Sequence, residues 1–323
     1  MTLVSIRLVT RNYDMLGPLV AGDVVPDGIE LTLDREAAIG TFPQNAALQA
    51  GEMSFSGYLR RIAAGADTIV ALPIVLMRGY RQRCFFTRRG SGLSSLADLA
   101  GKRVGTNGWP DTGNTWSRLA LLDAGVSLDS MSWWVGTIDG ATDELFGHRA
   151  SLAGLPERVT PVPTGQSLVE MLLSGRLDAL MIPWPPRGFY ATDSPIVRLV
   201  PDYRMVEQAY GRRVRYCPGH HILGVRADLL QRHPEVARTL FEAFEASRRQ
   251  AEERRLNLAD TSPWVLADLE ETATMLGADW QAHGVAPNRA MIGALAETMH
   301  TQGIVERALE VDDVFAGFER LLG

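Results

Sequence analysis

Cysteine, long apolar runs and blocks of basic residues are scarce in this sequence, and each shortage excludes a class of protein. The two cysteines, Cys84 and Cys217, lack the CxxC or CxxH spacing of a zinc site and are too few for a disulfide framework. Both lie in apolar runs, which predicts small buried side chains. No stretch approaches the roughly 20 apolar residues of a membrane span. The net charge of −6, without a basic block, argues against nucleic acid or a membrane surface as the partner.

Phosphate-binding motifs and metal-ligand spacings are also missing. The glycine-rich residues 108–114 precede a predicted helix, and such a loop offers free backbone N–H groups to an anion. The loop has neither the GxxxxGKS/T nor the GxGxxG spacing, so nucleotide binding is not indicated. Helix capping by Thr112 or Asn114 is the simpler interpretation. Histidine, aspartate and glutamate do not cluster at ligand spacing, and we predict that the protein needs no metal.

The N-terminal residues bear on the compartment. A secretory signal needs an uninterrupted apolar region of roughly 7–15 residues, and here Arg7, Arg11 and Asp14 interrupt the sequence at once. Residues 3–10 instead predict a first strand. A methionine followed directly by a strand favours a cytoplasmic protein.

The rest of the chain is organised around residues 70–89, VALPIVLMRGYRQRCFFTRR. Residues 70–76 form a nearly unbroken apolar run, which is typical of a parallel strand buried on both faces. The run breaks at Arg78, Tyr80 and Arg81. Ligands of open α/β sheets bind just beyond the carboxyl ends of such strands, so these side chains are candidate ligand contacts. Arginines that cap helices or face solvent are the alternative.

Alternating strands and helices predict an α/β protein with parallel sheets. A chain of 323 residues is long for one hydrophobic core and suggests two lobes. We expect a two-lobed fold in which each lobe is a mostly parallel sheet flanked by helices, with a cleft between the lobes. The first lobe is expected to comprise residues 1–87 and 220–323, and the inserted second lobe residues 88–219.

The residues between about 42 and 56 predict further ligand contacts. Residues 42–50 are expected to form a helix that ends at Gly51. Residues 53–56 are expected to form a short strand, on which Ser54 and Ser56 share one side because the side-chain period is two. Their hydroxyls could bind a ligand oxygen, or cap the next helix, the safer interpretation for Ser56.

Several stretches, in this order, carry a resemblance to a known family. SLADLAGKRVGT at residues 95–106 resembles the start of the second lobe in type II periplasmic-binding-protein folds. Within that superfamily the chain resembles the 4,5-dihydroxyphthalate decarboxylase family. The matching stretches are residues 13–31, 52–59, 71–81 and 112–118, LLSGRLDAL at 172–180 with Pro185 and Pro186, residues 200–213, and residues 218–245.

The resemblance implies a cytosolic carboxy-lyase that splits CO2 from a hydroxylated aromatic diacid without an organic cofactor. Its implied substrate contacts, together with the candidates above, are Arg11, Tyr13, Ser54, Ser56, Arg78, Tyr80, Arg81, Thr112 and Trp184. The sequence departs from the family pattern at Gln82, Gly108 and Trp184. The last of these replaces an arginine, which indicates one fewer substrate carboxylate or a different aromatic acid.

The chemistry of aryl decarboxylation explains why these residue types are needed. Loss of CO2 leaves carbanion character on the ring carbon unless that carbon is protonated first. A general acid therefore has to stand near the carbon, and such a group contributes about 10²–10⁴ in rate. Arginines such as Arg78 and Arg81 bind carboxylates in a bidentate manner that lysine cannot match. Trp184 could stack on an aromatic ring, although core packing is its common alternative.

His220 and His221 are the candidate catalytic residues. They are consecutive in a predicted strand, so their side chains point to opposite faces. The histidine of the family's returning strand matches His221, which we expect to be the proton donor because histidine titrates nearest neutrality. The alternative is a structural histidine that is hydrogen-bonded to a carbonyl at the hinge.

Two other functions stay open at this point. A non-catalytic solute-binding protein for a small carboxylate or aromatic ligand has the same fold. Another cytosolic enzyme on this scaffold, such as those of the menaquinone pathway, matches the stretches less well. The expected partner is a small aromatic carboxylic acid, and the sequence leaves open which acid it is and whether the chain forms a homo-oligomer.

Overall fold

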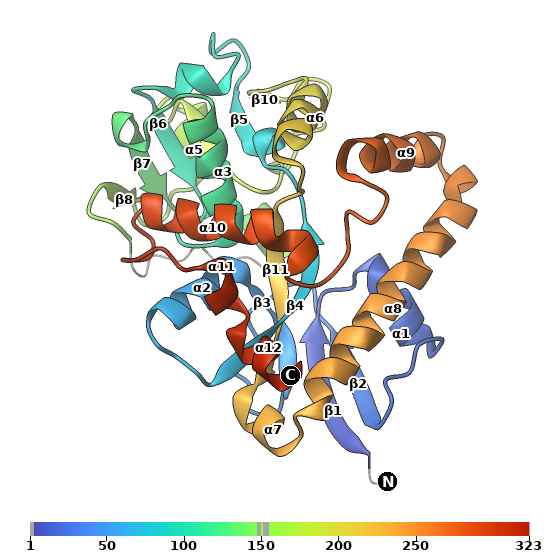
Figure 1. The fold of residues 1–323 in the computed structure, drawn as a ribbon. Helices are drawn as coiled ribbons and strands as arrows, with labels where there is room; N and C mark the ends of the chain where they lie inside the picture. Colours follow the sequence, from blue (N-terminus) through green and yellow to red (C-terminus); the bar gives the residue numbers. More distant parts are fainter. Residues whose placement is uncertain (1–2, 147–149, 151–154, 323) are drawn as a thin grey trace. The chain divides into compact units, whose positions relative to one another are not determined.

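The chain folds into two compact units, and a computed structural model describes residues 3–146, 150 and 155–322 (Figure 1). Unit 1 comprises Met1–Gly79 and Gly211–Gly323, and unit 2 comprises Tyr80–Tyr210. The sequence predicts boundaries after residues 87 and 219. The chain therefore leaves unit 1 once, builds unit 2, and returns.

Unit 1 is built on a five-stranded sheet with the strand order β2-β1-β3-β11-β4. The strands are β1 (Val4–Thr10), β2 (Ile29–Arg35), β3 (Ala50–Ser54), β4 (Ile69–Arg78) and β11 (Gly219–Arg226). Strand β1 is parallel to β2 and β3, whereas β11 is antiparallel to β3 and β4. A helix follows β1 and another follows β3, as expected of a parallel sheet, whereas turns connect β2 to β3. Strand β11, on the returning chain, runs the other way.

The long helix α8 (Glu235–Asn257) packs across the sheet of unit 1 (Figure 1). Val236, Leu240 and Phe244 recur every four residues and are buried against Leu8 and Leu72, as the apolar spacing predicts. The other helices of this unit are α1 (Gly17–Ala21), α2 (Phe55–Ala63), α7 (Ala227–Arg232), α9 (Val265–Leu276), α10 (Arg289–Thr301), α11 (Val311–Val314) and α12 (Ala316–Leu322), with the 3-10 turns η1 (Asp14–Leu16), η5 (Ala259–Thr261) and η6 (Ala286–Asn288).

Unit 2 contains a six-stranded sheet with the order β10-β5-β9-β6-β7-β8. The strands are β5 (Phe85–Arg88), β6 (Arg103–Thr106), β7 (Ser132–Val135), β8 (Val159–Pro161), β9 (Ala179–Met181) and β10 (Ile196–Arg198). Only β5 is antiparallel to its neighbours β9 and β10 among the described strands. Thus each unit is a mostly parallel sheet with one reversed strand, which confirms the predicted fold class.

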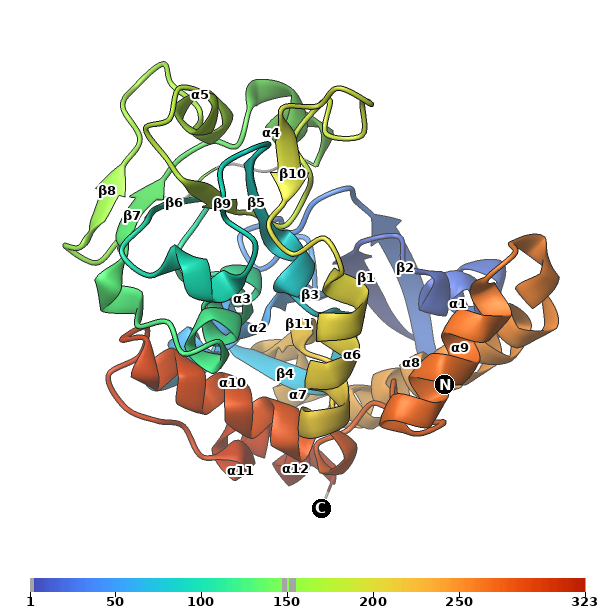
Figure 2. The same ribbon diagram turned by 90° about the horizontal axis from the view of Figure 1, so that it is seen from above.

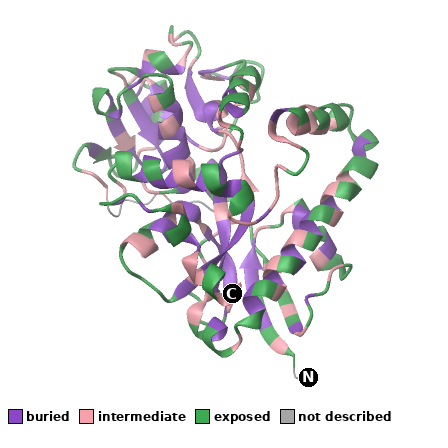
Figure 3. Cartoon of the chain, viewed as in Figure 1, coloured by how far each residue is buried: buried purple, intermediate pink, exposed green. Residues whose placement is uncertain are grey.

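Helices cover the sheet of unit 2 on two sides (Figure 2). They are α3 (Thr112–Asp123), α4 (Gly140–Leu145), α5 (Leu168–Leu173) and the first part of α6 (Tyr203–Val214), with the 3-10 turns η2 (Gln82–Cys84), η3 (Leu96–Leu99) and η4 (Leu128–Ser130). The end of α6, from Gly211, belongs to unit 1. One core joins α3 to the sheet through Leu121 and Trp133, and a second core joins α5 through Leu172 and Leu180. Figure 3 shows buried residues concentrated in the central strands, such as β4 and β11, whereas the edge strand β2 is mostly exposed or half-buried.

The helix predicted at residues 42–50 is wrong. The described backbone there forms turns, and Ala50 already belongs to β3. Gly51 is a strand residue on which the buried Phe42 packs, since a Cβ atom at Gly51 would lie 2.5 Å from the Phe42 Cβ. The apolar residues and the glycine therefore reflect packing on the strand rather than a helix and its C-terminal cap. In the polar segment 139–157, Gly140–Leu145 form α4, and residues 147–149 and 151–154 lie outside the described residues.

This close approach makes Gly51 a test of the packing. We expect Gly51→Ala to lower the free energy of unfolding by about 1–3 kcal/mol, as overpacking of a core does, in urea titrations followed by circular dichroism. Gly17→Ala is the matched control, because nothing lies within 4 Å of its added Cβ. Equal stability of the two variants would show that Phe42 does not pack on Gly51.

Candidate active site

Unit 1 contains a cluster of polar groups around Glu52, a buried residue of β3 that is 2% exposed. Its Oε2 accepts hydrogen bonds from the Thr10 hydroxyl at 2.8 Å and from the Arg11 backbone N–H at 2.7 Å. Its Oε1 accepts from the Tyr13 hydroxyl at 2.6 Å and from His221 Nδ1 at 2.5 Å. A buried carboxylate is tolerated only when it is hydrogen-bonded, and here two donors serve each oxygen.

The strands explain why these four groups meet. Thr10 ends β1, and Glu52 lies near the end of the parallel strand β3. In β11, His221 pairs with Ser54 of β3 and with Met77 of β4, and the register shifts on both sides of His221 in the pairing with β4. The cluster therefore lies at the carboxyl ends of the parallel strands, the edge where open α/β sheets bind ligands.

Glu52 and Tyr13 have opposite pKa shifts that fix their protonation. Burial alone would raise the pKa of Glu52, but the hydrogen bond and charge of His221, with the bonds from Tyr13 and Arg11, bring it below its ordinary value of 4.5. Burial first, and then the Glu52 charge, raise the pKa of Tyr13 above its ordinary value of 10.0. At neutral pH Glu52 is therefore a carboxylate and Tyr13 a neutral phenol.

These protonation states orient His221. A carboxylate only accepts hydrogen bonds, so His221 Nδ1 has to carry the proton that it shares with Glu52 Oε1. The other ring nitrogen, Nε2, is then the atom that can give or take a proton. The His221 side chain is 13% exposed, compared with 1% for Glu52. The pair has the geometry of a general acid–base group held by a buried carboxylate.

Arg11 supplies the positive charge beside this cluster. Its Nη1 lies 3.9 Å from Met77 Sδ, and its positive charge acts on the pKa of Tyr13 against the larger effects of burial and Glu52. The buried Nε of Arg11 has no hydrogen-bond partner in the part of the chain that the structure describes. An arginine with a donor still to satisfy is suited to hold a carboxylate.

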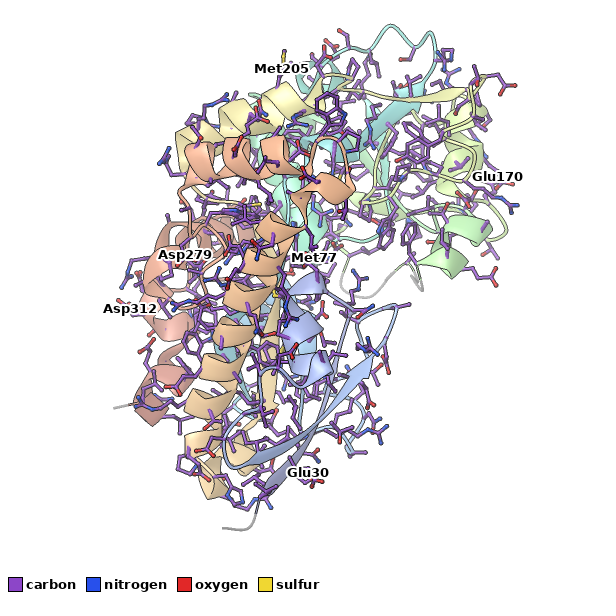
Figure 4. The ribbon with its side chains drawn as sticks, turned by 90° about the vertical axis from the view of Figure 1, so that its right-hand side faces the viewer. Glu30, Met77, Glu170, Met205, Asp279 and Asp312 are labelled. Atoms are coloured by element: carbon purple, nitrogen blue, oxygen red, sulfur yellow. The ribbon has the colours of Figure 1, made fainter. Side chains whose placement is uncertain are left out.

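Arg78 points elsewhere in unit 1. Consecutive strand residues face opposite sides, and Met77, labelled in Figure 4, contacts Arg11, whereas Arg78 Nη2 donates to the Ala282 carbonyl at 3.2 Å. Burial lowers the pKa of Arg78 to about 10. The environment of Arg78 is therefore the segment that precedes α10, including His283, and not the Glu52 cluster.

His220 makes the contact that the sequence offered as the structural alternative. Its Nε2 donates to the Gly79 carbonyl at 2.8 Å, and the residue is 1% exposed. The Gly79 N–H donates in turn to the Pro218 carbonyl at 2.9 Å. His220 thus fastens the last residue of unit 1 before unit 2 to the start of β11.

Ser54 and Ser56 do not share one side of a strand, so that prediction is wrong. Strand β3 ends at Ser54, and helix α2 begins at Phe55. Ser54 caps the helix by accepting from the Gly57 N–H at 3.3 Å, and its hydroxyl lies 3.2 Å from that of Ser56. The cap therefore falls on Ser54 and not on Ser56, because the chain turns into the helix two residues earlier than the pattern indicates.

In unit 2, Arg81 lies against the first turn of α3. A Cβ atom on Gly113 would be 3.0 Å from Arg81 Nη2, and Arg81 Nη1 lies 3.7 Å from Cys84 Sγ. Thr112 is the first residue of that helix and is buried. The cap is Asp111, which accepts from the Asn114 N–H at 2.9 Å, so neither predicted cap is correct.

The other predicted contacts of unit 2 are packed within it. Tyr80 makes an edge-on contact with Tyr210, with ring centroids 6.0 Å apart. Trp184 stacks on Phe146 with centroids 4.5 Å apart and planes inclined by 3°. The predicted tendency of Trp184 to stack on a flat ring is thus met by a protein side chain. Gln82 Oε1 accepts from the Arg81 N–H at 3.2 Å.

Glu52 is the residue that sequence analysis missed. It lies in the stretch AGEMS, where a single charge interrupts an otherwise buried strand. A carboxylate in such a position needs partners, and that need is the signal that could have identified it. Its partners lie about 40 and 170 residues away along the chain, so no local motif contains them.

The described residues contain neither a metal-binding cluster nor a membrane-spanning helix. Within the described ranges, no group of three or more histidine, cysteine, aspartate or glutamate residues is placed to hold a metal ion. Of the helices that the structure describes, none is long and apolar enough to cross a membrane.

Solved structures identify the fold of the chain. The chain is similar to the periplasmic aliphatic sulphonate binding protein SsuA from Escherichia coli, with a TM-score of 0.55 and 10% identity over 98% of this chain and 100% of the other. It is also similar to the desulfurization enzyme DszB, with a TM-score of 0.50 and 15% identity over 99% of both chains. At such identities the likeness concerns the fold alone, and the fold is the two-lobed periplasmic-binding-protein fold.

Sequence relatives narrow the class to a family. A 4,5-dihydroxyphthalate decarboxylase of Comamonas testosteroni is 29% identical over 327 residues, which span 98% of this chain and 97% of the relative. A protein of the same name from Pseudomonas putida is 31% identical over 195 residues, or 58% of this chain and 74% of the relative. No family model matches the chain. The chain belongs to the 4,5-dihydroxyphthalate decarboxylase family, whose members are carboxy-lyases.

The lowered pKa of Glu52 predicts how stability changes with pH. A carboxyl group whose pKa is lower in the folded state stabilises the fold above its unfolded value, near 4.5, and this contribution is lost as the pH falls through the folded value. We expect the stability advantage of the unchanged protein over Glu52→Gln to shrink below about pH 4.5 in urea titrations.

Glu207 provides the control with the opposite sign. Burial raises its pKa, although Arg83 opposes the rise. The stability of the unchanged protein relative to Glu207→Gln should therefore increase as the pH falls toward 4.5. If the difference in unfolding free energy between the unchanged protein and each glutamine variant changed with pH in the same direction, the lowered pKa of Glu52 would be contradicted.

Proposed function

We propose that this chain releases CO2 from a hydroxylated aromatic dicarboxylate, with 4,5-dihydroxyphthalate as the first candidate. Membership of the family supports the reaction class. The observation that carries the proposal to particular residues is the hydrogen bond between His221 Nδ1 and Glu52 Oε1, which leaves His221 Nε2 as the proton donor. The proposed product is 3,4-dihydroxybenzoate.

The proposed reaction is protonation followed by loss of CO2. In 4,5-dihydroxyphthalate each carboxylate has a hydroxyl para to it, and this hydroxyl feeds electron density into the ring carbon that bears the carboxylate. Protonated His221 gives its Nε2 proton to that carbon. The bond from the ring carbon to the carboxylate then breaks, its electron pair restores the aromatic ring, and CO2 leaves. His221 takes up a proton from water, so one proton is consumed for each CO2 released.

Arginines are proposed to hold the carboxylate that remains. Arg11 adjoins the His221 cluster within unit 1. In unit 2, Arg81 lies beside the first turn of α3, where the backbone N–H groups at a helix N-terminus also favour an anion. Trp184 is proposed to contact the substrate ring as part of a stacked pair with Phe146, not as a single side chain.

Other properties stay proposals of the same kind. We propose that the reaction needs neither a metal ion nor an organic cofactor, since the para hydroxyl itself donates the electron density that makes the ring carbon basic. Activity that is abolished by a chelator and restored by a divalent ion would overturn this. A cytoplasmic location is likewise proposed, and cell fractionation would test it.

A panel of aromatic acids tests the reaction. Purified protein should release CO2 from 4,5-dihydroxyphthalate and form 3,4-dihydroxybenzoate, both followed by chromatography. Phthalate is the matched control, since it keeps both carboxylates and lacks the hydroxyl that makes the ring carbon basic. Binding of the hydroxylated acid without turnover would instead assign the chain to the non-catalytic solute-binding proteins.

Arginine variants test the anchors. We expect Arg11→Ala and Arg81→Ala each to raise KM at least about tenfold, because a charge-assisted hydrogen bond contributes about 1.5–3 kcal/mol. Lysine at either position should rescue only in part, since the planar fork is lost. Arg7→Ala is the control, because Arg7 is exposed and pairs with Asp34 at the surface.

Arg78→Ala separates two roles for that residue. A rise in KM with unchanged stability would make Arg78 a substrate anchor, as its place in the sequence predicts. A loss of stability with unchanged KM would assign it to holding Ala282. Unchanged KM in both Arg11→Ala and Arg81→Ala would remove these two residues from the substrate site.

A further inference from the structure

We propose that Glu52 is a positioning residue that holds His221 in the single tautomer able to deliver a proton from Nε2. The inference rests on the proposed function, because it gives Glu52 a role only if His221 is the proton donor. Glu52 does not touch the reacting atoms in this scheme. It acts through the ring of His221.

The first step is that Glu52 itself cannot turn. Each of its two oxygens accepts two hydrogen bonds, from Thr10 and Arg11 on one side and from Tyr13 and His221 on the other. Two of these donors, the Thr10 hydroxyl and the Arg11 N–H, belong to the end of β1 and the residue that follows it. A rotation of the carboxylate would break several buried hydrogen bonds at once, so the acceptor stands at a defined place beside the His221 ring.

The second step is the placement of protons around Oε1. Tyr13 and His221 both approach this oxygen, and the Tyr13 hydroxyl lies 3.4 Å from His221 Nδ1. Tyr13 remains a phenol and gives its proton to Oε1, so it does not compete as an acceptor for the Nδ1 proton. Both short contacts to Oε1 are therefore donor-to-carboxylate bonds, and Nδ1–H is the form of His221 that fits.

The third step is the consequence for the reaction. With Nδ1–H held by Glu52, the protonated ring delivers its other proton from Nε2 and returns to the neutral Nδ1–H tautomer. Nε2 then regains a proton from water, while Glu52 and Tyr13 keep their charge states. A neutral amide at position 52 offers an N–H donor as well as a carbonyl acceptor, and a donor facing Nδ1 would favour the opposite tautomer, with the proton on Nε2 and the lone pair on Nδ1.

Three variants test the inference. We expect His221→Asn to lower kcat by about 10², as loss of a general acid does, and Glu52→Gln to lower kcat by about the same factor with KM unchanged. The double variant should be no slower than His221→Asn alone, because two residues that act as a unit are not additive. Glu207→Gln is the control for loss of a buried carboxylate elsewhere, and we expect it to keep kcat.

The outcomes distinguish the two proposals. Near-normal kcat in His221→Asn would overturn the proton donor of the proposed function. A low kcat in His221→Asn with near-normal kcat in Glu52→Gln would leave the proposed function standing and overturn the role of Glu52. A double variant slower than His221→Asn by the full effect of Glu52→Gln would also overturn it, since Glu52 would then act independently.

A measurement on the unchanged protein covers the case in which Glu52→Gln does not fold. Nitrogen NMR of protein labelled at histidine reports which ring nitrogen carries the proton. We expect the neutral ring of His221 to show a protonated Nδ1 and an unprotonated Nε2. A protonated Nε2 with an unprotonated Nδ1 would overturn the inference without the need for any variant.

Discussion

Burial of the Glu52 carboxylate is the constraint on which the candidate site in unit 1 depends. An ionised carboxylate that loses water without gaining partners is very costly, so the fold has to bring donors to it. Those donors come from the end of β1, from the turn that follows it, and from β11. The cluster is therefore complete only when the chain has built unit 2 and returned to the sheet. The same bonds that make Glu52 tolerable also fix the ring of His221.

Unit 2 buries a charge in a different manner. Arg118 in α3 is fully buried, donates to the Trp109 carbonyl at 2.7 Å and lies 4.1 Å from the centroid of the Trp109 ring. Burial lowers its pKa to about 9, against the charge of Asp111. This arginine is enclosed by its own loop and helix, and it stabilises the segment that carries Thr112 and Asp111. Buried charge thus organises both units, and in unit 1 it leaves the side chain of His221 partly exposed beside the carboxylate.

Ion pairs also hold the long helix α8 of unit 1 in place. Arg248 of α8 forms ion pairs with Glu245, Glu252 and Asp279, of which Asp279 lies beside α8 in Figure 4. This network ties α8 to the segment that also receives Arg78. The shared fold of this chain and a sulphonate-binding protein at 10% identity shows that such a scaffold tolerates nearly complete replacement of its residues. Chemistry has to be argued from the residues at the strand ends, not from the scaffold.

The α/β class, the apolar strand core at residues 70–76 and the resemblance to the family could be predicted from the sequence alone. These features depend on apolar spacing and on ordered stretches of sequence, both of which are local. The sequence also indicated that His220 and His221 face different surroundings, because consecutive strand residues alternate. Only the folded chain shows that His221 contacts Glu52 and Tyr13, that Arg78 contacts Ala282 while Met77 contacts Arg11, and that Phe42 packs on Gly51. Each of these contacts joins segments far apart in the chain, and its energy depends on burial and on hydrogen-bond partners that no local pattern contains.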